Sequence, residues 1–245
     1  MVKPYESGES KKEQITRMFN NIAHHYDFLN HFLSLGIDKI WRRKAIRELA
    51  SVNPKKIIDI ATGTGDLALK AMVLNPSEIV GIDISEEMLT YARRKVQKAG
   101  KESLIRFEKG DSEQINYPDH TFDAAMVAFG VRNFENVQLG ISEIYRVLVP
   151  GGMVVVLEFS RPQNFMVRII YDFYFLKIVP FFGKIFSKDN RAYNYLPESV
   201  AAFPSGKSFL QYFDKAGFVQ CKYKPLTFGI ASIYSSRKPG INDLK

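Results

Sequence analysis

A repeated alternation of short apolar runs with amphipathic segments, between residues 55 and 160, constrains the fold of this chain most strongly. The apolar runs have the length and composition of strands: KKIIDIA (55–61), EIVGID (78–83), LIRFEKGD (104–111), FDAAMVAFG (122–130) and GGMVVVLEFS (151–160). Helical patterns lie over 67–74, 85–100 and 135–148, and the second begins after Ser85 as N-cap. Strands that alternate with helices predict βαβ units, and therefore a mostly parallel sheet covered by helices on both faces.

The segments on either side of this region predict additions to one domain over residues 1–245. Residues 14–35 and 38–50 have the pattern of two helices, with Asp38 as N-cap of the second, so that residues 1–50 form an N-terminal helical lid. Residues 162–200 form an aromatic-rich insertion, in which FMVRIIYDFYFLKIVPFFGKIF (165–186) has eight aromatics in 22 residues. A helix over 206–216 and an antiparallel hairpin of strands 218–226 and 230–236 complete the sheet.

The charge balance points to an anionic partner. The formal net charge is +8, and residues 161–245 alone carry 13 basic and 5 acidic side chains. A single cysteine, Cys221, excludes an intrachain disulfide and a cysteine-based metal cluster, which favours a reducing compartment. The chain shows neither the apolar stretch of a signal peptide nor an apolar run long enough to cross a bilayer. We expect a cytoplasmic protein with a peripheral contact to the inner face of the membrane.

The turn after the first strand, GTGDLA, fits the G-x-G-x-x-A pattern of a nucleotide-binding loop. Glycines let the backbone approach a ligand, and Asp83, 18 residues after Gly65, can accept hydrogen bonds from ribose hydroxyls. These features fit a nicotinamide or flavin enzyme as well as an S-adenosylmethionine enzyme. A dehydrogenase therefore stays open on the loop alone.

Three further segments resemble motifs of class I S-adenosylmethionine-dependent methyltransferases. They are DIATGTG (59–65), GDSEQINYPDHTFD (110–123) and RVLVPGG (146–152). The resemblance implies an α/β, Rossmann-like fold with a seven-stranded mostly parallel sheet, here with N-terminal helices and a helical insertion before the last helix and β-hairpin. It places these residues at S-adenosylmethionine: Asp59, Ala61, Gly63, Thr64, Gly65, Asp83, Ile84, Asp111, Ser112 and Ala128. Ala128 can offer only its backbone, where related proteins often have serine.

Two longer segments resemble the signatures of one family, the quinone C-methyltransferases of menaquinone and ubiquinone biosynthesis. YDFLNHFLSLGIDKIW (26–41) carries the first signature, with Asp38 where the family commonly has histidine. RVLVPGGMVVVLEFS (146–160) carries the second, including Arg146 and Glu158, while FGVRNF (129–134) and YNYLPESVAAFP (193–204) resemble two further family blocks. The resemblance covers roughly residues 15–236.

This resemblance implies transfer of a methyl group to a ring carbon of a prenylated quinol, from demethylmenaquinol to menaquinol, without a metal ion. The alternatives are the benzoquinol of ubiquinone biosynthesis, another small molecule, or a basic nucleic-acid-binding module. Nucleic acid is disfavoured because the aromatics are mixed with aliphatics rather than set as a stacking groove. The acceptor-side candidates are Arg132, Asn133, Tyr26, Asn30 and Tyr195, followed by Tyr193 and Glu198. An arginine after the fourth strand can stabilise a developing quinolate.

The first signature, read as a helix, presents two stripes. We expect the apolar stripe of Phe28, Phe32 and Leu35 to dock on the core, with Tyr26 and Asn30 directed toward the cleft. We expect the insertion to cover the prenyl tail and to contact an anionic membrane, because it mixes aromatics with Lys and Arg. A buried cap or a homodimer surface is the alternative role of the insertion.

Overall fold

The computed structural model describes residues 2–179 and 190–241. The helices are α1 (Lys11–Leu33), α2 (Ile37–Leu49), α3 (Asp66–Ala71), α4 (Glu86–Lys98), α5 (Val137–Val147), α6 (Phe165–Phe173), α8 (Asn190–Ala202) and α9 (Lys207–Ala216). The strands are β1 (Lys56–Ile60), β2 (Glu78–Asp83), β3 (Ile105–Lys109), β4 (Phe122–Ala128), β5 (Leu148–Phe159), β6 (Val219–Leu226) and β7 (Ala231–Arg237). Short helical turns are η1 (Ala50–Val52), η2 (Met72–Leu74), η3 (Val131–Asn133), η5 (Thr227–Gly229) and the π-helical η4 (Tyr174–Ile178).

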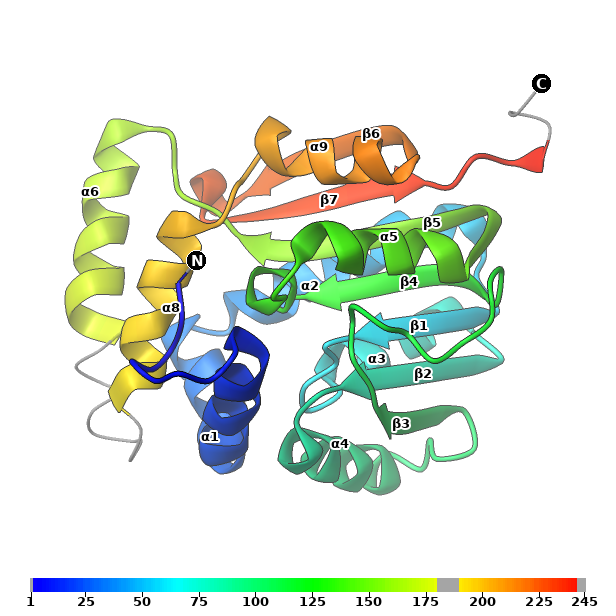
Figure 1. Cartoon of the computed structure of the whole chain (residues 1–245), viewed down its shortest axis with the longest axis horizontal. Helices are drawn as coiled ribbons and strands as arrows, with labels where there is room; N and C mark the ends of the chain where they lie inside the picture. Colours follow the sequence, from blue (N-terminus) through cyan, green and yellow to red (C-terminus); the bar gives the residue numbers. More distant parts are fainter. Residues whose placement is uncertain (1, 180–189, 242–245) are drawn as a thin grey trace.

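The strands form a seven-stranded sheet of order β3-β2-β1-β4-β5-β7-β6. β1 to β5 are parallel, while β7 runs antiparallel to both β5 and β6. Helices cover both faces of the sheet (Figure 1). Alternate side chains along β1 enter opposite cores, because Ile57 packs with α2, α3 and α4, whereas Ile58 packs with α5 and α9. The predicted mostly parallel sheet, its two helical layers and its edge hairpin are confirmed.

Three helices, α1, α6 and α8, lie beyond the carboxyl ends of the parallel strands (Figure 1). A capping box of Ser10 and Glu13 begins α1. A separate apolar cluster joins α1, η4 and α8 and includes Ile15 and Ile22 of α1, Val179 after η4 and Tyr195 of α8. Ligands bind at the carboxyl ends of strands in open α/β sheets, so these helices enclose the expected site.

The expected docking of the Phe28, Phe32 and Leu35 stripe on the core is wrong. These side chains are 55%, 41% and 78% exposed. The opposite, polar stripe of α1 faces the protein instead, because α3 and α4 offer it Asp66 and Lys95 as ionic partners. Helix α1 is amphipathic, as predicted, and its polar stripe faces inward because Asp66 and Lys95 form ion pairs with it.

The sequence predicts Asp38 as the N-cap of α2, and this prediction is wrong. Gly36 takes that place with φ 73°, a left-handed conformation that glycine adopts without steric cost. Asp38 lies in the first turn, 1% exposed, and accepts a hydrogen bond of 2.8 Å from the Ser34 hydroxyl. It also pairs with His31 at 2.9 Å and with Arg42 at 3.4 Å, so its role is to join α1 to α2.

The described part of the insertion, α6 with η4, divides into two faces. Tyr171, Phe175 and Val179 are buried against the site. The other face exposes Phe165, Met166, Ile169, Ile170, Phe173 and Leu176, each more than half exposed. The predicted helical insertion is confirmed for these residues, and its part over 180–189 lies outside the described residues. Within the described chain, we find no helix with the length and apolar character that crossing a membrane requires.

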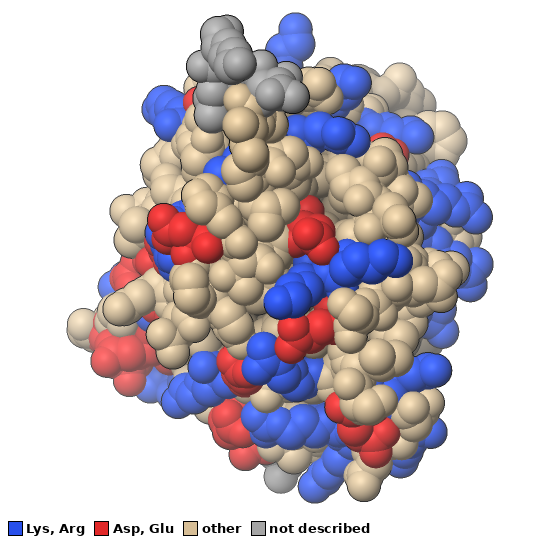
Figure 2. Space-filling model, turned by 90° about the vertical axis from the view of Figure 1, so that its right-hand side faces the viewer, with Lys and Arg blue, Asp and Glu red and all other residues tan. Residues whose placement is uncertain are grey.

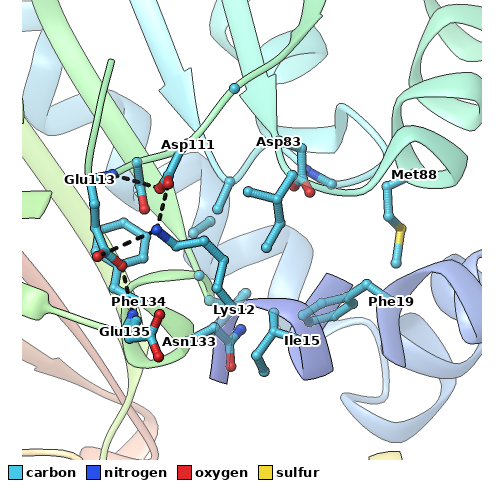
Figure 3. A pocket seen from close by; sticks show the side chains of 18 of the residues that line it. Lys12, Ile15, Phe19, Asp83, Met88, Asp111, Glu113, Asn133, Phe134 and Glu135 are labelled. Carbon is cyan, nitrogen blue, oxygen red and sulfur yellow. Dashed lines mark hydrogen bonds and ion pairs between the residues drawn. The ribbon is translucent and has the colours of Figure 1, made fainter. Parts of the chain in front are cut away.

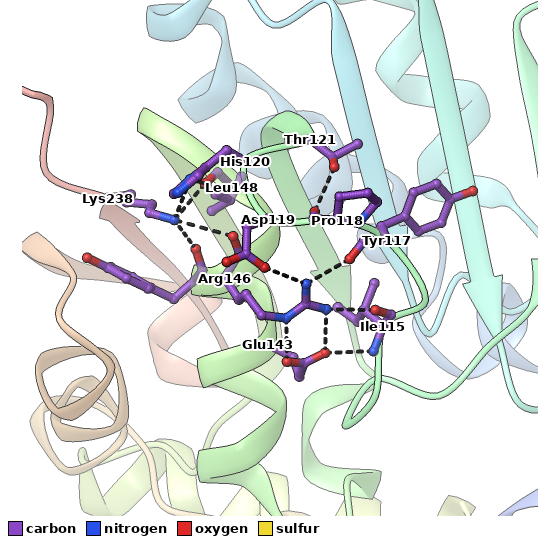
Figure 4. A network of polar contacts seen from close by, with 11 residues as sticks. Ile115, Tyr117, Pro118, Asp119, His120, Thr121, Glu143, Arg146, Leu148 and Lys238 are labelled. Carbon is purple, nitrogen blue, oxygen red and sulfur yellow. Dashed lines mark hydrogen bonds and ion pairs between the residues drawn. The ribbon is translucent and has the colours of Figure 1, made fainter.

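Arg146, a residue of the second signature, stabilises the fold at the amino ends of the strands (Figure 4). Its guanidinium donates to the carbonyl oxygens of Ile115 and Tyr117, both at 2.7 Å, and pairs with Glu143. Beside it, the buried Lys238 donates from Nζ to the carbonyl oxygens of Tyr145 and Leu148, both at 2.7 Å. These contacts cap the end of α5 and lie far from the helices that enclose the site.

Lys238→Met should therefore destabilise the protein without affecting ligand binding. Removal of the ammonium leaves buried carbonyl oxygens without a donor, and we expect a loss of about 2 kcal/mol in the free energy of unfolding. Urea denaturation followed by circular dichroism measures this loss. Lys222→Met, on the exposed face of β6, is the matched control and should change stability by less than about 0.5 kcal/mol. Equal stability of the two variants would contradict the structural role of Lys238.

Candidate active site

The glycine turn after β1 brings the backbone close to the end of β2. Gly63 has φ 57°, and its N–H donates to Asp83 Oδ2 at 2.8 Å. Gly65 has φ 80° and begins α3, and a Cβ there would lie 2.8 Å from the Phe107 ring. Both positions therefore require glycine, one for the tight turn and one for close packing of helix on strand.

Ala61 also adopts a left-handed backbone, with φ 51°, although it carries a side chain. Its Cβ would lie 2.6 Å from a Cβ at position 130, which is why Gly130 opens the turn after β4. The two turns thus approach each other at the carboxyl ends of adjacent strands β1 and β4. The side chain of Ala61 is accommodated by the glycine opposite it, Gly130.

Asp83 ends β2 with its carboxylate held by two backbone donors, Gly63 N–H at 2.8 Å and Ser85 N–H at 2.9 Å. Burial raises the pKa of this carboxyl to about 6. A carboxylate fixed at the end of the second strand is suited to accept the hydroxyl groups of a ribose.

A cavity lies beside this turn and contains many of the predicted cofactor residues (Figure 3). The predicted residues that line it are Ala61, Gly63, Asp83, Ile84, Asp111, Ser112 and Ala128. Asp59, Thr64 and Gly65 do not line it. Asp59 is buried and accepts a hydrogen bond from the Thr62 hydroxyl at 2.6 Å, while Thr64 donates to Asp27 of α1. The polar side chains that do line the cavity, Asp83, Asp111 and Ser112, are of the kinds that can bind the hydroxyl and amine groups of S-adenosylmethionine.

Lys12 of α1 covers this cavity, a role that the sequence did not reveal. Its Nζ lies 2.5 Å from Asp111 Oδ2 and 3.6 Å from Glu113 Oε2, and Figure 3 shows it between the two carboxylates. The cavity that these residues line has a volume of about 60 Å³. A lysine in a polar, N-terminal helical turn carries no local signal of this role.

Two further ionic contacts tie α1 to the glycine-turn region. Lys95 of α4 pairs with Asp27 at 2.5 Å and with Asp66 at 2.7 Å. His31 lies between Asp38 and Asp66, with its two ring nitrogens 2.9 Å and 3.3 Å from their carboxylates. These groups are close enough to resemble a metal site, but each carboxylate already pairs with a cation of the protein. The cluster therefore acts as an attachment for α1.

A second cavity, of about 480 Å³, adjoins the first and is mainly apolar. It is enclosed by α1, α6, η4, α8 and the turns after β4 and β5, and we call it the acceptor cavity. Four of the predicted catalytic residues line it, namely Tyr26, Asn30, Arg132 and Tyr195. The fifth, Asn133, lines the cofactor cavity. Phe19, Tyr26 and Phe129 line both cavities, so the two ligands would meet there.

A buried ion pair lies at this junction. Arg132 Nη1 is 2.8 Å from Glu158 Oε1, and the two side chains are 8% and 0% exposed. The same Arg132 nitrogen donates to the carbonyl oxygen of Phe129. The sequence indicates Glu158 only as part of the second signature. Its position in an otherwise apolar strand, VVVLEF, was the signal that could have marked it as a partner for a buried cation.

The backbone of the Arg132 turn is held from outside by Lys11. Its Nζ donates to the carbonyl oxygens of Arg132 and Phe134, each at 2.8 Å. Burial, together with the Arg132 charge, lowers the pKa of Lys11 to about 8. Two cationic side chains, Lys11 and Arg132, thus belong to or hold the turn that faces the acceptor cavity.

Tyr195 and Asn133 connect α8 to the same turn. The Tyr195 hydroxyl donates to Asn133 Oδ1 at 3.1 Å, and burial raises the pKa of this tyrosine to about 12. Tyr195 therefore stays a neutral donor that orients Asn133. Glu198 is exposed and lies outside both linings, whereas the Tyr193 side chain is outside the described residues.

Comparison with known proteins agrees with this geometry. The ubiE/COQ5 methyltransferase family matches residues 7–238. A demethylmenaquinone methyltransferase of Bacteroides fragilis is 46% identical, over 97% of this chain and 97% of its own length. A ubiquinone/menaquinone biosynthesis C-methyltransferase of Geotalea daltonii is 44% identical, over 93% and 97%. A solved S-adenosylmethionine-dependent methyltransferase of Thermotoga maritima superposes with a TM-score of 0.62 at 19% identity, covering 91% of this chain and 99% of that one. This likeness confirms the predicted class I methyltransferase fold.

Cofactor affinity should depend on pH through Asp83. Its pKa of about 6 means that the carboxylate, which we expect to accept the ribose hydroxyls, is present above that pH and is lost below it. We expect the Kd for S-adenosylmethionine to rise about tenfold for each pH unit below 6, as measured by isothermal titration calorimetry. Asp83→Asn should bind about 10- to 100-fold more weakly at neutral pH and lose most of this dependence. An unchanged pH profile in the variant would show that another group titrates.

Proposed function

This chain belongs to the ubiE/COQ5 methyltransferase family, and we propose that it methylates a ring carbon of a prenylated quinol, with demethylmenaquinol as the acceptor. The observation that carries this proposal is the large apolar cavity next to the cofactor cavity, with one buried arginine at their junction. Its aromatic walls suit a planar ring, and its size leaves room for part of a prenyl tail.

S-adenosylmethionine supplies an electrophilic methyl group, and the electron pair of the broken carbon–sulfur bond remains on sulfur. The protein must provide a carbon nucleophile in line with that methyl group. The reduced ring is the reactive form, because its hydroxyl oxygens donate electron density to the ring carbons. When the new carbon–carbon bond has formed, the ring carbon loses its proton and the ring becomes aromatic again. That proton returns to the ring oxygen that was ionised before the transfer, whose own proton had passed to solvent.

Arg132 is the residue that this chain offers to the developing charge. Ionisation of the hydroxyl beside the attacked carbon strengthens the nucleophile, and a guanidinium stabilises the resulting oxyanion. Glu158 holds the guanidinium in place from the side of β5. Because the cavity is mainly apolar, this charge interaction is poorly screened by water.

Asn133, Tyr195, Tyr26 and Asn30 shape the space around the reacting atoms. Asn133 lines the cofactor side and is oriented by Tyr195. Tyr26 lines both cavities, and Asn30 lines the acceptor cavity from the next turn of α1. Closure of α1 over both ligands would bring these two side chains into position and exclude water.

We also propose that the exposed face of α6 rests on the membrane that holds the acceptor. Leu35, Ile170 and Phe228 are 78%, 70% and 80% exposed and line the acceptor cavity, so its mouth has an apolar rim. The apolar face of α6 continues from this rim, with Lys177 exposed beside it. The side of the molecule away from α6 shows Lys and Arg interspersed with Asp and Glu instead (Figure 2). An apolar surface around a cavity mouth suits transfer of a prenylated ring from a bilayer.

Incubation of the protein with S-adenosylmethionine and a reduced monoprenyl dihydroxynaphthalene tests the function. We expect a product heavier by one methylene group, seen by mass spectrometry, and none from the oxidised quinone. Arg132→Lys should lower kcat about 100-fold, because a guanidinium donor to the oxyanion is lost. Its Kd for S-adenosylmethionine should stay unchanged, since Arg132 does not line the cofactor cavity. Methylation of a benzoquinol but not of the naphthoquinol would contradict the proposed acceptor.

Flotation with phosphatidylglycerol vesicles tests the membrane contact. The wild-type chain should float with the vesicles, whereas Met166→Asp combined with Phe173→Asp should not, because two charges would enter the apolar face. Val73→Asp is the matched control, since Val73 is 73% exposed but lies on η2, away from α6. Wild-type protein that fails to float, or a dimer that the α6 double variant dissociates, would assign this face to a protein interface instead.

A further inference from the structure

Two residues that line the acceptor cavity each have a buried polar atom without a hydrogen-bond partner. Among the described side chains, three buried nitrogen or oxygen atoms are unpaired: Arg132 Nε, the Tyr171 hydroxyl and Ser236 Oγ. Arg132 and Tyr171 both line the acceptor cavity, whereas Ser236 lines neither cavity. Buried polar groups are normally satisfied, so two exceptions in one cavity indicate a ligand with two polar atoms.

The other tyrosine hydroxyls of the insertion that line this cavity are already paired. Tyr174 donates to the carbonyl oxygen of Leu33 at 2.6 Å, and Tyr195 donates to Asn133 at 3.1 Å. The Trp41 indole N–H likewise donates to Thr227 at 2.8 Å. Tyr171 is therefore distinguished from its neighbours by its hydroxyl and not by its ring.

A continuous aromatic wall joins the two unpaired groups. The Tyr171 ring stacks on Phe175 with a centroid distance of 4.2 Å and an interplanar angle of 26°. Phe175 meets the Phe159 ring edge-on at 5.9 Å, and Arg132 Cζ lies 5.6 Å from the Phe159 centroid. Such a wall favours a flat aromatic ligand with polar atoms on its rim.

The Tyr171 hydroxyl stays protonated in this environment. Burial raises the pKa of Tyr171 well above its usual range, with a further contribution from the nearby Asp172, and the Arg132 charge opposes this shift only in part. Tyr171 is therefore a neutral hydrogen-bond donor rather than a base. Arg132 Nε–H is likewise a donor, so the two groups match two oxygen atoms of a ligand.

The two donors lie at different depths relative to the cofactor. Arg132 precedes Asn133, which lines the cofactor cavity, and follows Phe129, which lines both cavities. Tyr171 comes from α6, and α6 contributes only to the acceptor cavity. Arg132 is thus the donor on the cofactor side, and Tyr171 is the donor on the remote side.

We propose that Tyr171 binds the quinol oxygen remote from the methyl-accepting carbon, while Arg132 Nε binds the oxygen beside that carbon. This inference rests on the proposed function and names the group that sets the ring's orientation. Two hydrogen bonds across a planar ring select which ring carbon faces the methyl donor. Tyr171 is then a substrate-binding residue that orients the ring and takes no proton from it.

Substrate and enzyme hydroxyls can be removed one at a time to test this contact. The two acceptors are the reduced monoprenyl dihydroxynaphthalene and its counterpart that lacks the hydroxyl beside the prenyl carbon. Loss of that hydroxyl from the acceptor should lower kcat/KM of the wild-type enzyme about 10-fold more than it lowers kcat/KM of Tyr171→Phe. The variant has no tyrosine hydroxyl to bind the missing group, so it has no hydrogen bond to lose. Tyr171→Phe should also keep or raise the melting temperature, because no hydrogen bond is lost.

Tyr174→Phe is the matched control, because it removes a paired hydroxyl from the same cavity wall. It should retain the wild-type ratio of kcat/KM between the two acceptors and should lower the melting temperature. The same ratio in wild type and Tyr171→Phe, or a melting temperature of Tyr171→Phe several degrees lower, would overturn the inference. If the wild-type enzyme methylates neither acceptor, the proposed function is wrong. If it methylates them but Tyr171→Phe leaves the ratio of kcat/KM between the two acceptors unchanged, only the role of Tyr171 is wrong.

Discussion

The buried ion pair between Arg132 and Glu158 is the interaction on which the rest of the site depends. Glu158 also accepts the backbone N–H groups of Arg132 and Phe159, so one carboxylate holds a side chain and two backbone positions. Loss of either partner would leave a buried charge uncompensated, at a cost of about 3–5 kcal/mol. The pair therefore fixes the turn after β4, and this turn contributes to both the cofactor cavity and the acceptor cavity.

Helix α1 covers both the cofactor cavity and the acceptor cavity. Lys12 reaches Asp111 in the cofactor cavity, and His31 reaches Asp66 at the start of α3. One helix thus contacts the segments predicted to bind the cofactor and also lines the acceptor cavity. These ionic contacts are partly exposed, so they exchange with water at a lower cost than an apolar interface of similar size.

The sheet and the cofactor turn were predictable because their signals are local. Apolar runs of strand length and glycines at left-handed positions report the backbone directly, and the strand ends located Arg132 and Asn133. The orientation of α1 was not predictable, because its two stripes were both plausible inner faces. Charges on α3 and α4 turned Asp27 and His31 inward and left Phe28 exposed, and no pattern within α1 contains that information.

The α/β class, the nucleotide-binding turn and the family signatures can be recognised in the amino-acid sequence, because each depends on neighbouring residues along the chain. Which polar groups are paired depends on the folded structure. Tyr171, Tyr174 and Tyr195 are equivalent as sequence, yet the first has an unpaired buried hydroxyl and the other two donate to protein acceptors. Hydrogen-bond satisfaction depends on every atom within reach in space, and helices far apart in the chain supply those atoms.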